Sequence, residues 1–200
     1  MNRRGVRFVP TRVQRLFSKE RPPFARFDRA AVGETQPRPD AMAQLIQRIG
    51  HDGRLRHIRN RSYFDWRFRN PFREYRFLYA GDEELDGYLV LRSEKHAQTV
   101  SIVDLEAISG RVRAGLLKAA VTAGAFRDLA IWTATADTET MEQLAALKFK
   151  PPDSKLDLGQ PFLIRTIDLD PREAEWRLED GLQLLEAGNW DIRMLYSMHG

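Results

Sequence analysis

Two acidic residues, Asp104 and Glu106, lie two positions apart in an apolar run that predicts a strand over residues 99–107. Side chains at positions i and i+2 of a strand share one face, so both carboxyl groups should point the same way, with Val103 and Leu105 on the other face. Acids are rarely buried unpaired. One of the two could be a general base with a raised pKa. The alternative is an ion pair with the arginine-rich segment earlier in the chain.

A basic loop follows this strand and leads into a predicted helix. Arg111 and Arg113 could hold phosphate groups by charge-assisted hydrogen bonds, and the backbone N–H groups at the helix start would add to such a site. The alternative is that both arginines only cover the first turn of the helix. The residues of this loop and helix start are Ile108, Ser109, Gly110, Arg111, Val112 and Arg113.

Aromatic residues are interleaved with arginines between residues 54 and 76. Such a segment can follow a nucleic-acid backbone and stack on bases. The aromatic side chains are also spaced closely enough to form part of a core, and we favour the core interpretation, so nucleic acid is not the expected partner. The aromatic residues concerned are Tyr63, Phe64, Trp66 and Phe68.

Several classes of chemistry lack the residues that they need. The 200-residue chain has no cysteine, which excludes disulfides, thiolate metal sites and cysteine nucleophiles. Its four histidines are scattered without the spacing of metal ligands, so no metal is expected. Neither a serine nucleophile elbow nor a Walker loop is present. No apolar run reaches the roughly 18 residues that cross a bilayer, and we expect a cytoplasmic protein without a transmembrane segment.

The charge of the chain is distributed unevenly. Residues 1–80 carry 19 Lys and Arg against 7 Asp and Glu, a net +12, and the remainder carries 13 against 21, a net −8, which together give +4. A basic half beside an acidic half suggests an anionic partner on one face, such as a phosphorylated cofactor, nucleic acid, a membrane surface or an acidic protein. The alternative is a solvated arginine-rich surface.

The elements that must position these residues follow from periodicity and from turn residues. Residues 1–23 are basic and irregular and predict a tail or linker, and residues 24–200 predict one domain. Strands are expected over 24–32, 75–80, 87–93, 99–107, 129–135, 162–169 and 190–196. Helices are expected over 40–49 with Asp40 as N-cap, shortly before 70, around 116–121, over 138–147 and over 173–187. The strands between 75 and 107 predict an antiparallel meander, and the helix before 129 predicts a parallel crossover.

The element order over residues 24–197 resembles the GNAT (GCN5-related N-acetyltransferase) fold. This fold is α/β (α+β), with a mixed, mostly antiparallel twisted sheet of about seven strands and helices on both faces. A more specific likeness is carried by Trp66, Arg67, Phe68, Pro71 and Tyr75. These residues resemble the motif that opens the second GNAT-like half of bacterial tandem acetyltransferase-like proteins.

The resemblance implies an acyltransferase that moves an acetyl group from acetyl-CoA to an amine or hydroxyl of a small-molecule, sugar or protein acceptor. In such an enzyme Glu106 or Asp104 would assist proton removal, and residues 108–113 would face the pyrophosphate of the cofactor. Trp66 and Arg67 would lie in the acceptor groove.

The same resemblance implies a second possibility. The glycine positions of the family's phosphate loop hold Ser109, Arg111 and Arg113, and Leu144 stands where the family has a tyrosine general acid. These departures predict a catalytically degenerate binding or assembly module. Surface-polysaccharide production is one process in which such a module could take part. A homodimer paired through an exposed strand, or an upstream GNAT domain, is a further expectation.

Overall fold

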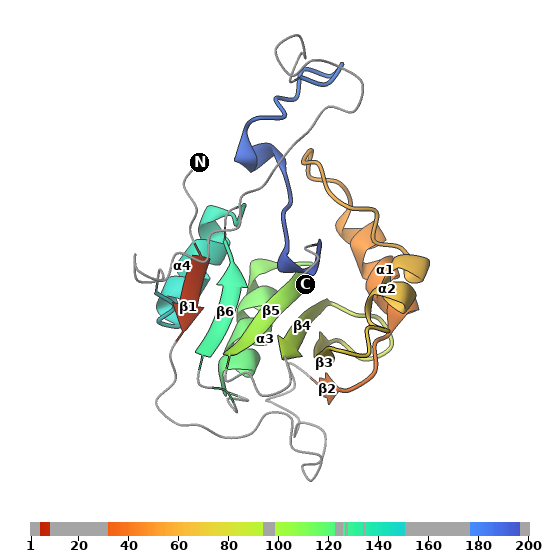
Figure 1. Ribbon diagram of the computed structural model, residues 1–200, viewed down its shortest axis with the longest axis vertical. Coiled ribbons are helices and arrows are strands. Elements are labelled where there is room, and N and C mark those ends of the chain that lie inside the picture. The colour runs from red at the N-terminus through yellow and green to blue at the C-terminus, as the bar shows by residue number, and fades with distance from the viewer. Residues whose placement is uncertain are drawn as a thin grey trace.

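The computed structural model describes residues 5–8, 32–93, 99–122, 126, 128–133, 135–150 and 177–196 (Figure 1). The strands are β1 (Gly5–Phe8), β2 (Val32–Glu34), β3 (Glu74–Ala80), β4 (Gly87–Ser93), β5 (Thr99–Ala107) and β6 (Asp128–Trp132). The α-helices are α1 (Pro39–Ile49), α2 (Arg61–Arg67), α3 (Gly110–Thr122) and α4 (Thr138–Ala146), and the short 3-10 turns are η2 (Ala187–Asn189) and η3 (Met194–Tyr196).

Within the described residues the strands form one sheet of six, in the order β1-β6-β5-β4-β3-β2. Neighbouring strands are antiparallel except β5 and β6, which are parallel and are joined through α3. The predicted meander, the parallel crossover and the mixed, mostly antiparallel α/β architecture are therefore confirmed. The strand expected over 162–169, which would be a seventh, lies outside the described residues. β1 falls within the segment for which the sequence predicts an irregular tail.

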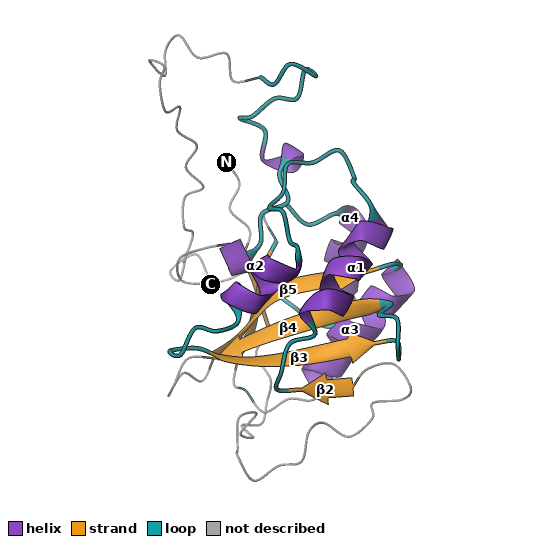
Figure 2. Ribbon diagram, turned by 90° about the vertical axis from the view of Figure 1, so that its right-hand side faces the viewer, coloured by secondary structure: helices purple, strands orange, loops and turns teal. Residues whose placement is uncertain are grey.

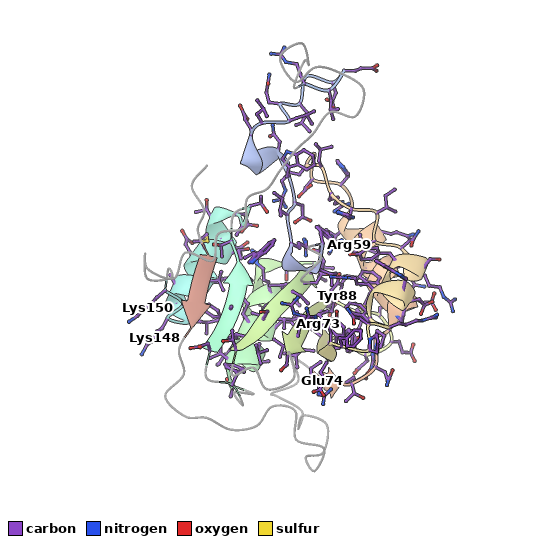
Figure 3. All side chains as sticks on the ribbon, viewed as in Figure 1. Arg59, Arg73, Glu74, Tyr88, Lys148 and Lys150 are labelled. Carbon is purple, nitrogen blue, oxygen red and sulfur yellow. The ribbon has the colours of Figure 1, made fainter. Side chains whose placement is uncertain are left out.

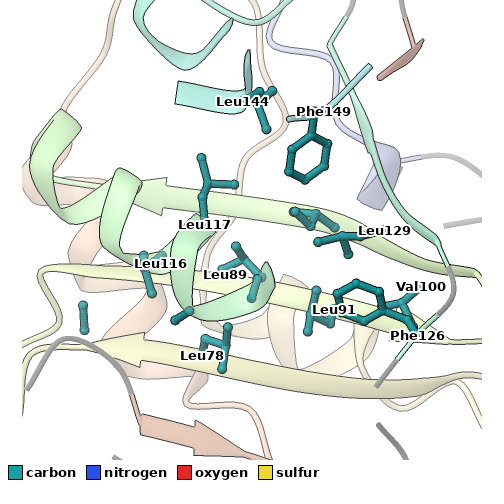
Figure 4. Close-up of a cluster of buried hydrophobic side chains, with 14 residues drawn as sticks. Leu78, Leu89, Leu91, Val100, Leu116, Leu117, Phe126, Leu129, Leu144 and Phe149 are labelled. Carbon is teal, nitrogen blue, oxygen red and sulfur yellow. The ribbon is translucent and has the colours of Figure 1, made fainter. Parts of the chain in front are cut away.

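Helices cover both faces of the sheet, with α1 and α2 on one side and α3 and α4 on the other (Figure 2). On the second side, Leu116 and Leu117 of α3 pack against Leu89 and Leu91 of β4 (Figure 4). The alternate residues of β4, among them Tyr88, face α1 and α2 instead. Because successive side chains of β4 point to opposite faces of the sheet, this central strand contributes to the hydrophobic cores on both sides.

The pairing of β5 with β4 contains one irregularity that decides where its acids point. Asp104 lies opposite Val90 and Ile102 lies opposite Leu91, so Val103 has no opposite residue on β4. Val103 packs in the core below α1 and α2, on the side that Asp104 also faces. The prediction that Val103 faces away from the acids is therefore wrong, because an extra residue breaks the strict alternation.

One helix boundary and two C-terminal elements differ from the sequence predictions. α1 begins at Pro39 with Arg38 as N-cap, so Asp40 lies in the first turn and is not the cap, because proline suits the first helical position. The predicted helix over 173–187 is wrong across its described part, where Gly181 has φ +89° and belongs to a turn. The predicted strand over 190–196 is also wrong, since only Trp190 forms a bridge, to Leu55. No helix in the described part of the chain is long and apolar enough to cross a membrane.

Candidate functional site

Five charged side chains meet between β5, the loop before α2 and the segment that follows Trp190. Arg59 donates from Nη1 to Asp104 Oδ1 at 3.1 Å and also pairs with Glu106. Arg193 lies 2.7 Å from Asp104, 2.8 Å from Glu106 and 2.9 Å from Asp191. The side chains of Arg59 and Asp104 are fully buried. We call Arg59, Asp104, Glu106, Asp191 and Arg193 the charge cluster; it contains three carboxylates and two guanidinium groups.

Local structure explains how each arginine reaches this position. Asn60 caps α2 by accepting a hydrogen bond from the Tyr63 backbone N–H, which fixes the chain next to Arg59. The backbone of Leu55 donates to Asn189 O and accepts from the Asp191 N–H, both at 2.8 Å. Residues 189–196, which we call the closing segment, are therefore held against the loop that carries Arg59. Figure 3 shows Arg59 and Tyr88 between the sheet and the helices α1 and α2.

The surroundings of Asp104 set its protonation state. Burial favours the neutral acid, but the charges of Arg59 and Arg193 and a hydrogen bond from Tyr88 at 2.8 Å outweigh burial, so the pKa of Asp104 lies below its ordinary value of 3.8. Burial and the nearby carboxylate in turn raise the pKa of Tyr88. The expected ion pair with the arginine-rich segment is present, whereas the raised pKa considered for a base is not found at Asp104.

The low pKa of Asp104 predicts an acid-sensitive contribution to stability. A carboxyl whose pKa is lower in the folded state stabilises the fold above its unfolded-state pKa and loses this effect as pH falls through the folded value. Asp104→Asn should therefore be less stable than the parent protein at pH 7, and the gap should narrow below about pH 4. Urea unfolding at a series of pH values measures the gap. Asp65→Asn, at an exposed ion pair, serves as control and should stay near the parent throughout.

A cleft of about 150 Å³ lies beside the charge cluster where β5 and β6 separate. The two strands pair from Thr99–Asp128 as far as Ile102–Ile131 and then diverge. The continuation of β5 through Ala107 forms one wall, and Thr135 to Asp137 form the other. Asp104, Glu106, Asp191 and Arg193 all line this cleft.

The closing segment joins the two walls of the cleft. On one side Arg193 donates to the backbone carbonyl of Leu105 in β5. On the other, the Ile192 N–H donates to Thr135 Oγ1 at 3.0 Å, and this hydroxyl lies 3.3 Å from Ile192 O. Arg54 also donates to the Thr135 carbonyl, at 2.9 Å. The Leu105 carbonyl and the carbonyl and hydroxyl groups of Thr135, which lie where β5 and β6 diverge, thus form hydrogen bonds within the chain.

The predicted phosphate loop is arranged differently from expectation. Of residues 108–113 only Arg113 lines the cleft, and it pairs with Glu139, with Asp137 at 3.5 Å and with Gln143 at 3.0 Å. A Cβ atom added to Gly110 would overlap the Glu139 carboxyl, so this carboxylate occupies the space beside the start of α3. Ser109 Oγ accepts from the Val112 N–H at 3.3 Å, as a capping residue does, while Ile108 is half exposed and Arg111 exposed.

The contribution of α4 was not anticipated from the sequence. Glu139 and Gln143 lie one turn apart, and Gln143 also donates to the Gly110 carbonyl at 2.9 Å. The acid and amide at spacing i, i+4 on a helix were the available signal, but nothing in the sequence indicates which loop they contact.

The predicted substrate-binding pair lies apart from this cleft. Trp66 is 67 % exposed, and neither Trp66 nor Arg67 lines the cleft. Phe64 is the aromatic residue of α2 that is fully buried. The core interpretation is correct for Phe64 and wrong for Trp66, because only one face of a short helix can meet the sheet.

Among the described residues no group of three or more His, Cys, Asp or Glu side chains could hold a metal ion. No family model, no curated protein and no solved structure matches the chain, so a functional proposal rests on the geometry of the charge cluster and of the cleft.

Proposed function

We propose that this chain is a GNAT-like domain that has lost acyl-transfer chemistry and serves as a binding or assembly module. The observation that carries the proposal is the charge cluster, in which the two candidate bases, Asp104 and Glu106, are each paired with both Arg59 and Arg193. The resemblance to tandem acetyltransferase-like proteins suggests surface-polysaccharide production as the setting.

A base that deprotonates an ammonium group works best when its pKa lies near the operating pH. Two guanidinium groups do the opposite for Asp104, because they stabilise its charged form and lower its pKa. Glu106 pairs with the same two guanidinium groups, so both carboxylates are held within the charge cluster. The cluster is therefore better suited to fastening the closing segment than to moving protons.

The residues at the start of α3 do not fit the pyrophosphate of acyl-CoA. A phosphate cradle needs open space and free positive charge at the helix start. Here the Glu139 carboxylate fills the space beside Gly110 and pairs with Arg113. An incoming phosphate would meet a negative charge and would have to displace this pair.

A second candidate is the acyltransferase itself, acting from acetyl-CoA on an amine or hydroxyl acceptor. The observation that favours it is the cleft at the divergence of β5 and β6, which is lined by Asp104, Glu106 and Arg113. Its volume of about 150 Å³ is below the range of roughly 300–1,000 Å³ usual for ligand pockets. A whole cofactor would therefore extend well beyond this cleft.

Calorimetric titration with acetyl-CoA and with free CoA separates the two candidates. The module predicts no binding heat at millimolar ligand and no release of CoA thiol with a panel of amine and sugar acceptors. Saturable micromolar binding that Arg113→Ala abolishes would overturn the module and support the acyltransferase. Arg111→Ala is the matched control, because Arg111 is on the same helix, exposed and outside the cleft. Glu139→Gln is a third variant to titrate: binding of CoA gained only in this variant would show that Glu139 excludes the phosphate.

A further inference from the structure

Three large apolar side chains on and beside the short helix α2 are exposed. Ile58, just before the helix, is 82 % exposed, Trp66 in its last turn 67 %, and Phe72 in the following turn 79 %. Two exposed arginines, Arg61 and Arg69, lie between them in the chain, and Arg61 also pairs with Asp40 and Asp65. We call these five residues the α2 surface. Large apolar side chains gathered on a charged rim are typical of protein-binding sites, whereas single exposed ones are ordinary.

A second exposed feature of opposite charge lies near the C-terminal end of the described chain. Residues 177–189, which we call the arm, stand away from the sheet at the top of Figure 1. Leu178 is 38 % exposed and Leu185 58 %. The arm carries one arginine against three exposed acids, namely Glu179, Asp180 and Glu186. It therefore combines exposed leucines with a net negative charge.

The arm is held in a defined shape rather than left free. A bridge joins Arg177 and Gln183, the Trp190 indole donates to the Leu184 carbonyl at 2.9 Å, and the Asn189 amide donates to Gln183 O at 2.8 Å. The hydrogen bonds of Leu55 with the closing segment fasten its base beside the loop that leads to α2. A preorganised segment loses little conformational entropy when it binds.

We propose that a second copy of this chain places its acidic arm on the α2 surface. Charge complementarity carries the choice of partner: the arm has one arginine against three acids, whereas residues 54–76, which hold the α2 surface, have eight arginines against two acids. Each feature also presents apolar side chains that are exposed in the single chain. A two-fold arrangement makes the contact twice, because the arm of each copy meets the α2 surface of the other. Opposite charges at the rim favour the encounter, and the leucines and Trp66 supply apolar burial.

Sedimentation of the whole chain between about 1 and 500 µM, at low and high salt, tests this proposal. We expect a monomer–dimer equilibrium that weakens as salt rises. Trp66→Ala on the α2 surface and Leu185→Ala on the arm should each weaken it about tenfold or more. Ile108→Ala is the control: Ile108 is 51 % exposed and belongs to neither feature, so this variant should dimerise like the parent.

A mixing experiment distinguishes this contact from self-association through another surface. In a mixture of the Trp66→Ala and Leu185→Ala proteins, the intact arm of the first can meet the intact α2 surface of the second. The other contact of the mixed dimer lacks both side chains. Since the proposal packs Trp66 against Leu185, losing both there costs less than the sum of the two single losses, so association in the mixture should exceed that of either variant alone. A protein that stays monomeric throughout the range would overturn the proposal. So would a dimer that neither variant weakens, or one that mixing does not restore, and circular dichroism of each variant confirms that it is folded.

Discussion

Replacement of Arg59 by methionine should lower the free energy of unfolding by about 3–5 kcal/mol, the usual cost of removing one partner from a buried ion pair. Arg59 is fully buried and contacts Asp104 and Glu106. Without it, three carboxylates would share the single guanidinium of Arg193, and at least one negative charge would lie unpaired away from water. Urea unfolding at pH 7 measures the change.

Arg61→Met provides the matched comparison for this variant. Arg61 pairs with Asp40 at 3.2 Å and with Asp65 at 3.6 Å, but its side chain is 66 % exposed. Water screens such pairs, and the expected loss is at most about 1 kcal/mol. Equal losses in the two variants would show that the charge cluster does not stabilise the fold in the way that its burial indicates.

Phe64→Ala should cost about 3–5 kcal/mol, since truncation of a buried phenylalanine loses burial and leaves a cavity. The ring is fully buried and lies edge-on to Tyr88 at 6.1 Å between centroids and stacked with Phe68 at 6.0 Å. It joins α2 to the sheet beside the charge cluster. Thermal or urea unfolding gives the loss directly.

Trp66→Ala is the control within the same helix. Because Trp66 is 67 % exposed, its removal should change the stability of the monomer by only about 0.5 kcal/mol. Both variants are compared at low protein concentration, where self-association does not contribute. A larger loss from Trp66→Ala than from Phe64→Ala would mean that α2 packs on the sheet through its other face.

Local patterns were sufficient to predict the centre of the sheet. The predicted strands 87–93 and 99–107 coincide with β4 and β5, since each is a β-branched or apolar run bounded by turn residues. The end of α1 was predicted for the same kind of reason, because Gly50 takes a φ of +77° that favours glycine. These features depend on neighbours in the chain.

The charge cluster depends instead on residues far apart in the chain and could be predicted only in part. The pairing of Asp104 and Glu106 with an arginine of the 54–76 segment was a stated alternative, but nothing local distinguishes Arg59 from the exposed arginines around it. Arg193 was expected on a strand, and its approach to β5 follows from hydrogen bonds made by Leu55 and Thr135. The bulge at Val103 and the contact of Glu139 with Gly110 likewise have no local signature.

The distance along the chain between Asp104 and Arg193 has a consequence for synthesis. Arg193 follows Asp104 by 89 residues, and at about 5–20 residues per second its guanidinium arrives roughly 4–18 s later. During that interval β5 carries acids that have only Arg59 as a cationic partner within the cluster. The acids of β5 are therefore translated well before the second arginine that pairs with them, so the rate of synthesis sets the earliest moment at which the charge cluster can be complete.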